Sequence, residues 1–273
     1  MSGFPLVDAG LVARIERAGV DDLCAWVTEA RESGVYPDAA AFRVAGGAAV
    51  WFSPSNVVNG SFGLGIGRPV EQEEVAALVA FFAERGAPAK TDVCPHADPS
   101  LTRWLAEAGF LVTDFETVLY QPLPAEGLPD MPDGIEVRVA ATAEDRALWA
   151  DLEARGFADD APSDGDRALS DAISRRPGAL PFLGYLDGEA AGTGMLNLVG
   201  GTAMFNGDST LSVARGRGVQ TALLAERLRY AAERGCDLAV IEADSSGGSQ
   251  RNQLRAGFRV AYTRVCMELP KRV

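Results

Sequence analysis

The chain is 273 residues long, with 47% hydrophobic residues, 23% charged residues and a formal net charge of −13. The length predicts two domains of ordinary size or one large one, and the composition is typical of a globular protein with a buried core. The acidity argues against binding to nucleic acid or to an anionic membrane, because both need a basic surface, and it serves solubility as well. We therefore expect neither partner.

Location and thiol chemistry follow from two further features. No apolar run approaches the roughly 18 residues of a membrane helix, and the first residues lack the basic-then-apolar order of a signal peptide, so we expect a cytoplasmic protein. The four cysteines lie singly in apolar stretches, and the chain has one histidine, His96. This predicts buried thiols, no disulfide framework, no metal site and no Ser-His-Asp triad.

The first half of the chain predicts alternating helices and strands up to Tyr120. Apolar residues at helical spacing predict a helix that ends at Gly86, and a strand follows at residues 91–94. A helix around residues 101–108 and strands up to Tyr120 complete this half. Four prolines, from Pro122 to Pro132, then mark a polar linker.

The second half opens with an alternating strand from Gly134. Helices at residues 144–155 and about 166–176 follow, then strands at residues 181–185 and 190–198 that a turn at Asp187 and Gly188 connects. A strand from Ser209 leads through a glycine-bearing turn into an amphipathic helix that ends at Gly235. A strand at residues 238–241, a short helix and an extended segment at residues 259–269 close the chain.

Two short matches indicate that the chain repeats itself. Ala-Glu-Arg-Gly occurs at residues 83–86 and 232–235, and Ala-Gly-Phe occurs at residues 108–110 and 256–258, with separations of 25 and 24 residues. The predicted elements around these matches also agree. We interpret this as a duplication, with domains at residues 1–124 and 134–273 and a linker at residues 125–133.

The turn at residues 215–218 has the properties of an anion site. The first turn of a helix leaves backbone N–H groups unpaired, the helix dipole adds partial positive charge, and glycines let phosphate oxygens approach the backbone. Arg215 and Arg217 add formal charge where a diphosphate would bind. An ordinary connecting turn between a strand and a helix rarely has two arginines at this place.

This segment resembles motif A of the GNAT superfamily of acyl-CoA N-acyltransferases, Arg/Gln-x-x-Gly-x-Gly/Ala, which binds the CoA diphosphate. Arg215 matches the first position and Gly218 the fourth, whereas Gln220 replaces the usual small residue at the sixth. Because the donors there are backbone amides, a longer side chain that points outward need not abolish binding. The order of elements from Ile135 to Leu269 resembles the family as well. The resemblance implies an α+β fold: two tandem GNAT-like domains, each with a mixed, mostly antiparallel central sheet flanked by helices.

The same alignment predicts that the first copy has lost the CoA site. Pro69 and Glu71 fall where Gly218 and Gln220 stand in the second copy. Proline removes a backbone donor, and a carboxylate at the helix start repels phosphate. Glycines 63, 65 and 67 are similar to a dinucleotide-binding fingerprint, but they lead into a proline, so we interpret them as part of a degenerate strand.

The resemblance also implies direct transfer from acetyl-CoA or another short acyl-CoA. The pantetheine arm would pair with the strand before the turn, at residues 211–213, and a backbone N–H there would stabilise the oxyanion. The expected cofactor-binding residues are Leu211, Ser212, Val213, Arg215, Gly216, Arg217, Gly218, Val219, Gln220, Thr221 and Asn252. For Asn252, an exposed position on the helix is the alternative.

Three residues are candidates for catalysis. Glu242, at a strand end, and Asp208, just before the motif strand, could serve as the base, although both positions also suit solvated charges. Many family members have a tyrosine acid four residues before the Gly-Phe pair, where this chain has Gln253. Ser249 could protonate the leaving thiolate, with water as the alternative, but it also suits the N-cap of the short helix.

An acidic stretch at residues 157–171 lies where the resemblance places acceptor selection. Its five aspartates would attract a cationic amine, or form an ordinary solvated loop. We expect an acetyl-CoA-dependent N-acetyltransferase that acts on a small-molecule amine as a monomer or homodimer. The alternatives are a non-catalytic acyl-CoA-binding regulatory or interaction protein, which the missing tyrosine favours, and a nucleotide-binding domain.

Overall fold

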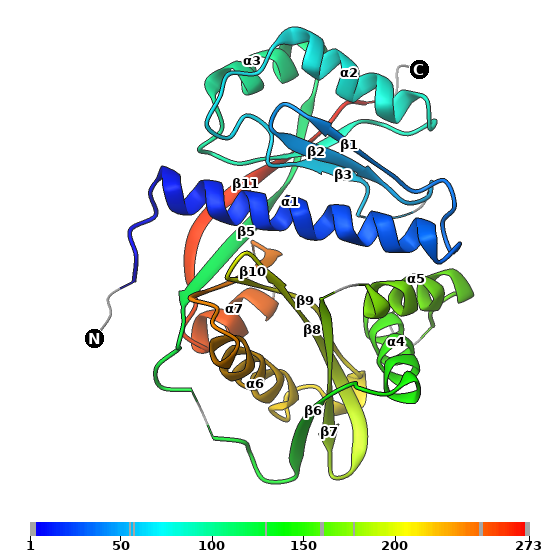
Figure 1. Cartoon of the computed structure of the whole chain (residues 1–273), viewed down its shortest axis with the longest axis vertical. Coiled ribbons are helices and arrows are strands. Elements are labelled where there is room, and N and C mark those ends of the chain that lie inside the picture. Colours follow the sequence, from blue (N-terminus) through cyan, green and yellow to red (C-terminus); the bar gives the residue numbers. More distant parts are fainter. Residues whose placement is uncertain are drawn as a thin grey trace. The chain divides into compact units, whose positions relative to one another are not determined.

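The structure is a computed structural model that describes residues 4–54, 56, 58–128, 130–158, 161–176, 178–245 and 248–270. The chain forms two compact units, which we describe separately (Figure 1). Unit 1 comprises Met1–Val118, Ala243–Ser246 and Val260–Val273, and unit 2 comprises Leu119–Glu242 and Gly247–Arg259. Among the described helices, none combines the length and the apolar character that crossing a membrane requires.

The helices and strands follow the order that the sequence predicts from about residue 72 onward. The helices are α1 (Ala9–Glu32), α2 (Gln72–Ala83), α3 (Pro99–Ala108), α4 (Ala143–Phe157), α5 (Asp164–Arg175), α6 (Val219–Glu233) and α7 (Gly248–Arg255), with a 3-10 turn, η1 (Ser212–Ala214). The strands are β1 (Ala40–Val44), β2 (Gly47–Trp51), β3 (Gly60–Phe62), β4 (Lys90–Val93), β5 (Leu111–Pro122), β6 (Ile135–Val139), β7 (Ala179–Leu186), β8 (Glu189–Val199), β9 (Thr202–Thr210), β10 (Leu238–Asp244) and β11 (Arg259–Glu268). The long α1 and the strands β1–β3 are additions to the sequence prediction.

Unit 1 contains two groups of strands. The antiparallel sheet β1-β2-β3 packs against α1, whose buried residues include Val12 and Ile15. The strands β4, β11 and β5 are neighbours in that order, and β11 runs antiparallel to β4, with Val265 opposite Val93. The apolar sides of α2 and α3 complete the core of this unit, where Phe82 and Leu105 are fully buried.

The placement of β11 differs from the predicted domain ranges. The last strand was expected to close the domain at residues 134–273, but residues from Val260 onward belong to unit 1. A buried ion pair between Arg264 of β11 and Glu16 of α1, 3.0 Å apart, explains this preference, because each charge would be costly to bury without the other. Tyr262 donates a second hydrogen bond to Glu16, at 2.7 Å.

Unit 2 has a mixed, mostly antiparallel sheet. Its strands follow the order β10-β9-β8-β7-β6, with β10 parallel to β9 and the remaining neighbours antiparallel. Helix α6 lies on one face of the sheet, and α4 and α5 lie on the other (Figure 1). The predicted fold class is therefore confirmed. The predicted turn at Asp187 and Gly188 is also present, and both residues have positive φ angles, 52° and 86°.

Two local predictions need correction. The strand that the sequence places before the glycine turn ends at Thr210, and Ser212–Ala214 form η1 instead of continuing the strand. The backbone N–H of Leu211 still donates to the carbonyl of Ala191 at 3.0 Å, and the turn begins where the N–H of Ala214 donates to the carbonyl of Leu211 at 2.9 Å. None of the four cysteines forms a disulfide, but Cys24 and Cys266 are only partly buried.

Candidate functional site

The glycine turn between η1 and α6 has the backbone geometry of an anion site. Gly216 and Gly218 have φ angles of 75° and 90°, a left-handed conformation that a residue with a Cβ adopts only at a cost. Gly218 is the N-cap of α6, so it turns the chain directly into the helix. The first N–H groups of α6 therefore point out of the helix end, where an anionic group can accept from them.

Two arginines flank this helix end. Arg217 pairs with Asp187 at 2.8 Å, and both side chains are more than half exposed. Arg215 donates from Nε to the carbonyl of Thr210 at 3.2 Å. An exposed ion pair contributes little to stability, so a phosphate could displace Asp187 from Arg217 at small cost.

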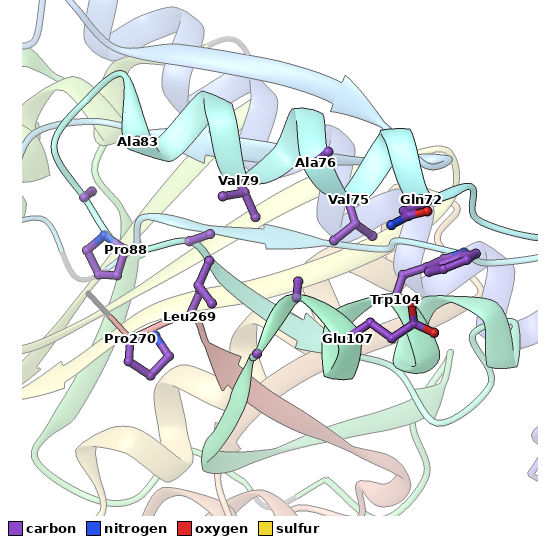
Figure 2. A pocket seen from close by; sticks show the side chains of 14 residues that line it. Gln72, Val75, Ala76, Val79, Ala83, Pro88, Trp104, Glu107, Leu269 and Pro270 are labelled. Carbon is purple, nitrogen blue, oxygen red and sulfur yellow. The ribbon is translucent and has the colours of Figure 1, made fainter. Parts of the chain in front are cut away.

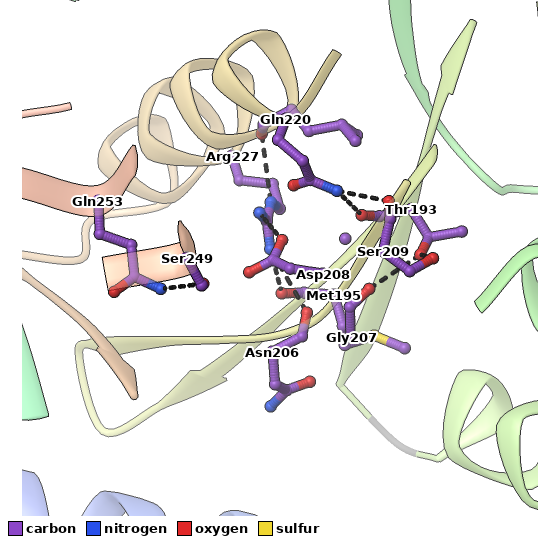
Figure 3. Close-up of polar contacts among 12 residues, drawn as sticks. Thr193, Met195, Asn206, Gly207, Asp208, Ser209, Gln220, Arg227, Ser249 and Gln253 are labelled. Atoms are coloured by element: carbon purple, nitrogen blue, oxygen red, sulfur yellow. Dashed lines mark hydrogen bonds and ion pairs between the residues drawn. The ribbon is translucent and has the colours of Figure 1, made fainter. Parts of the chain in front are cut away.

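Gln220, at the position where motif A usually has a small residue, points inward and not outward. Its Nε2 donates to the carbonyls of Thr193, at 3.2 Å, and Ser209 (Figure 3). These bonds tie the first turn of α6 to β8 and β9. Because the side chain lies on the sheet side of the helix, it does not cover the backbone donors at the helix end.

Strand β9 has a bulge close to this turn. Thr193 of β8 faces Ser209, whereas Met195 faces Asn206, so β9 has one more residue than β8 over this stretch. Gly207 has a φ angle of 62°, and its carbonyl accepts a hydrogen bond from Thr193 Oγ1 at 2.9 Å. A bulge turns the affected backbone groups away from the regular ladder and reorients the neighbouring side chains, here those of Asn206 and Asp208.

A fully buried arginine, Arg227 of α6, supports the bulge (Figure 3). Its Nη1 donates to the carbonyls of Met195, at 2.9 Å, and Asn206, at 3.5 Å, and its Nε donates to Leu223 in its own helix. Its Nη2 pairs with the carboxylate of Asp208. Burial raises the pKa of Asp208, and the nearby Arg227 guanidinium opposes that rise.

The bulge lies beyond the pairing between β9 and β10. The parallel register runs from Thr202 and Leu238 to Phe205 and Ile241. Glu242 is the next residue of β10 and is partly buried. The structure therefore has two of the predicted candidates, Asp208 and Glu242, in the parts of β9 and β10 that follow the end of their shared ladder.

Comparison with known proteins identifies this part of the chain. Residues 146–258, which include most of α4 and all of α5, β7–β9, α6, β10 and α7, match the family model of the acetyltransferase (GNAT) family. This segment is a GNAT domain. No curated protein matches the chain in sequence.

Solved structures with the same fold cover more of the chain. A GCN5-related N-acetyltransferase from Kribbella flavida has 17% identity and a TM-score of 0.67, covering 91% of this chain and 96% of that one. One from Sphaerobacter thermophilus has 25% identity and a TM-score of 0.53, covering 67% and 59%. A tandem GNAT protein from the clavulanic acid biosynthesis pathway has 18% identity and a TM-score of 0.57, covering 82% and 76%.

In the GNAT domain, α7 positions the remaining candidates. Ser249 lies inside the first turn of the helix, which begins at Gly248, so it is not the N-cap. Its Oγ accepts a hydrogen bond from Gln253 Nε2 at 3.0 Å. Gln253 is buried, and its Oε1 accepts no hydrogen bond within the described part of the chain. Asn252 is exposed, and its Oδ1 accepts from Arg255.

The described aspartates of the acidic stretch have local partners in or next to α5. Asp166 forms a capping box with Ser163, and Asp171 pairs with Arg175. Asp164 lies 3.9 Å from Arg167 and is fully exposed. Asp159 and Asp160 lie outside the described residues. The described aspartates therefore favour the interpretation of a solvated helix start over that of an amine-binding surface.

In unit 1, a carboxylate occupies the turn that corresponds to the phosphate site. The Nη1 and Nη2 atoms of Arg68 donate to the carboxylate of Glu74, at 3.0 and 2.8 Å. The backbone N–H groups of Glu71 and Ala45 donate to the same carboxylate. Burial acts to raise the pKa of Glu74, but these hydrogen bonds outweigh it and hold the pKa below its usual value. Sequence reasoning missed Glu74; a glutamate three residues after Glu71, as in a capping box, was the available signal.

Unit 1 also contains a groove between α2 and α3, of about 800 Å³ (Figure 2). It is lined mostly by small apolar side chains, including Val79 and Pro88, with Gln72, Trp104 and Glu107 toward one end. The lining residues belong to unit 1, whereas the glycine turn belongs to unit 2. The groove is thus not the space that a CoA diphosphate at α6 would occupy.

Proposed function

We propose that the chain is an acetyl-CoA-dependent N-acetyltransferase that transfers an acyl group to a small-molecule amine. The observation that carries this proposal is the start of α6: two glycines with positive φ angles and two arginines, next to a bulged strand, within a GNAT domain. An acyl-CoA with a short acyl group other than acetyl fits the same argument.

The cofactor would be held in two parts. The diphosphate would accept hydrogen bonds from the N–H groups of residues 216–221 and from Arg215 and Arg217. The pantetheine arm would run along the end of β9 from the bulge to residues 211–213, on the side that β10 leaves open after Ile241. The N–H of Leu211 already donates to the carbonyl of Ala191, so Val213 is the better donor in η1.

The chemistry would be direct transfer. The amine nitrogen attacks the thioester carbonyl, and a bulge N–H stabilises the oxyanion. Glu242 or Asp208 accepts the proton that the nitrogen loses, and the C–S bond breaks. Ser249 accepts from Gln253 and therefore keeps its own proton for a hydrogen bond to the leaving thiolate, which takes up a proton through water.

The rest of the chain would be a degenerate copy of the same domain. The element order α2-β4-α3-β5 is the same as α6-β10-α7-β11, and Arg68 and Glu74 close the turn where a diphosphate would bind. This supports a duplication with a linker at residues 125–133. We place the protein in the cytoplasm, as a monomer or homodimer.

Removing Arg215 tests the cofactor site. We expect Arg215→Ala to weaken acetyl-CoA binding about tenfold or more in calorimetry, because a hydrogen bond to a charged group contributes about 1.5–3 kcal/mol. Arg229→Ala is the matched control: it removes the same charge from within α6, the helix that follows the turn, at a partly exposed site that pairs with Glu226. Equal binding by both variants, or no binding by the unchanged protein, would reject this site.

A second candidate function is acyl-CoA binding without catalysis. Gln253 favours it, because an amide cannot serve as the acid that a tyrosine supplies at this position in many GNAT proteins. Release of free thiol from acetyl-CoA, measured against a panel of polyamines and aminoglycosides, separates the two. Tight binding with no turnover on any amine would support the second function.

A further inference from the structure

Arg227 is the most unusual side chain of the GNAT domain. It lies in the middle of α6 and is fully buried, and its nitrogens contact β8, β9 and Asp208. Its guanidinium also lies 4.9 Å from the centre of the Phe205 ring. Most long charged side chains keep their heads in water, so this arrangement needs a reason.

The neighbouring strand is shaped to receive the guanidinium. A Cβ added at Gly194 of β8 would lie 2.5 Å from Arg227 Cζ, so only glycine leaves the space. A buried ion pair is often no more stable than well-packed apolar residues of similar size. Stability alone therefore does not account for a buried charge at this place.

The partner carboxylate remains accessible, although Arg227 is not. The side chain of Asp208 is 21% exposed, whereas that of Arg227 is 0% exposed. The residues that β8 and α4 place around the pair, Thr193, Met195 and Trp149, carry no charge, and Glu242 of β10 is the carboxylate just past the β9–β10 ladder. Arg227 is thus the cation that contacts Asp208, and its charge favours the ionised carboxylate.

We propose that Arg227 is a positioning residue that orients Asp208 as the base for the acceptor amine and keeps it ionised. The inference rests on the proposed acyl transfer and chooses Asp208 over Glu242. One carboxylate oxygen is held by Arg227, and the exposed part of the group faces the reacting nitrogen. As the C–N bond forms, Asp208 takes the N–H proton, the C–S bond breaks, and the proton passes through solvent to the CoA thiolate.

The test compares Arg227→Met, Arg227→Lys and Asp208→Asn in the full-length protein. We expect Asp208→Asn to lower kcat about 100-fold, the lower range for a lost general base, with little change in acetyl-CoA affinity. Arg227→Met should lower kcat and move the acidic limb of the kcat/KM profile to higher pH, since Asp208 then loses its cation. Arg227→Lys should restore part of both effects. Arg229→Met, the same substitution at a partly exposed site of α6, should change neither kcat nor the position of the acidic limb.

The outcomes separate this inference from the function on which it rests. If the unchanged protein binds no acetyl-CoA or acetylates no amine, the proposed function fails. If the unchanged protein binds acetyl-CoA and acetylates an amine, two results would reject the inference alone. The first is an acidic limb that stays in place in both Arg227→Met and Arg227→Lys. The second is a loss of turnover in Glu242→Gln but not in Asp208→Asn. If Arg227→Met does not fold, Arg227→Lys and the nearly isosteric Asp208→Asn still decide the question.

Discussion

Single side chains decide which of the two similar turns can bind an anion. In unit 2, Gln220 turns toward the sheet and leaves the start of α6 open. In unit 1, Glu74 bonds to Arg68 and to two backbone N–H groups, and so takes the place of an external anion. The neutral Gln220 amide donates to the sheet, whereas the charged Glu74 carboxylate accepts hydrogen bonds from the turn.

Glu74 gives a prediction about stability and pH. We expect Glu74→Gln to lower the free energy of unfolding by about 1.5 kcal/mol at neutral pH, because hydrogen bonds to a charged acceptor are weakened. The folded pKa of Glu74 lies below its ordinary value of 4.5, so its contribution is complete above that value and is lost as the pH falls through the folded pKa. Urea unfolding should show the two proteins converging below pH 4.5. A difference that grows at low pH would contradict the assignment.

At the scale of elements, the approach of α6 to the sheet depends on glycines in the strands below it. A Cβ at Gly184 of β7 would lie 2.9 Å from Val219 and 3.1 Å from Leu223. Any residue with a Cβ at position 184 would therefore push α6 away from β7. Because Val219 is the first residue of α6, this contact also fixes the distance between the glycine turn and β9.

Gly184→Ala tests this packing. We expect a loss of about 1–3 kcal/mol in the free energy of unfolding, the usual cost of forcing extra atoms into a packed core. Gly248→Ala is the control, since the nearest atom to its added Cβ lies 3.8 Å away, at the flexible end of Arg251. Thermal or urea unfolding compares the two. Equal stability of both variants would show that α6 has room to move.

At the scale of the whole molecule, the compact units do not follow the order of the chain. The C-terminal strand β11 pairs with β4, more than half of the chain away, and the buried pair Arg264 and Glu16 holds it there. The duplication predicted from the sequence thus describes the order of elements, whereas β11 belongs to the compact unit that contains β4.

The pair gives a test of this exchange. Arg264→Met leaves the carboxylate of Glu16, 2% exposed, without its cation, and we expect a loss of about 3–5 kcal/mol. The double variant Glu16→Gln with Arg264→Met should recover part of that loss, because the fully buried charge of Glu16 is gone; Glu116, which also pairs with Arg264, is 28% exposed. Hydrogen exchange should show faster opening at β4 and little change at β7 and β8. Equal changes in all these strands would argue against a separate unit 1.

The sequence by itself determined the fold class, most elements from residue 72 onward and the place of the glycine turn. These depend on local periods, on glycines and on charges a few residues apart, which a linear reading contains. It assumed an outward Gln220, did not identify Glu74, and assigned β11 by its place in the chain alone. Only the tertiary structure decided these, because the partners of Gln220, Arg227 and Arg264 lie 27, 32 and 248 residues away in the chain, and burial at those contacts fixes which direction or pairing is stable.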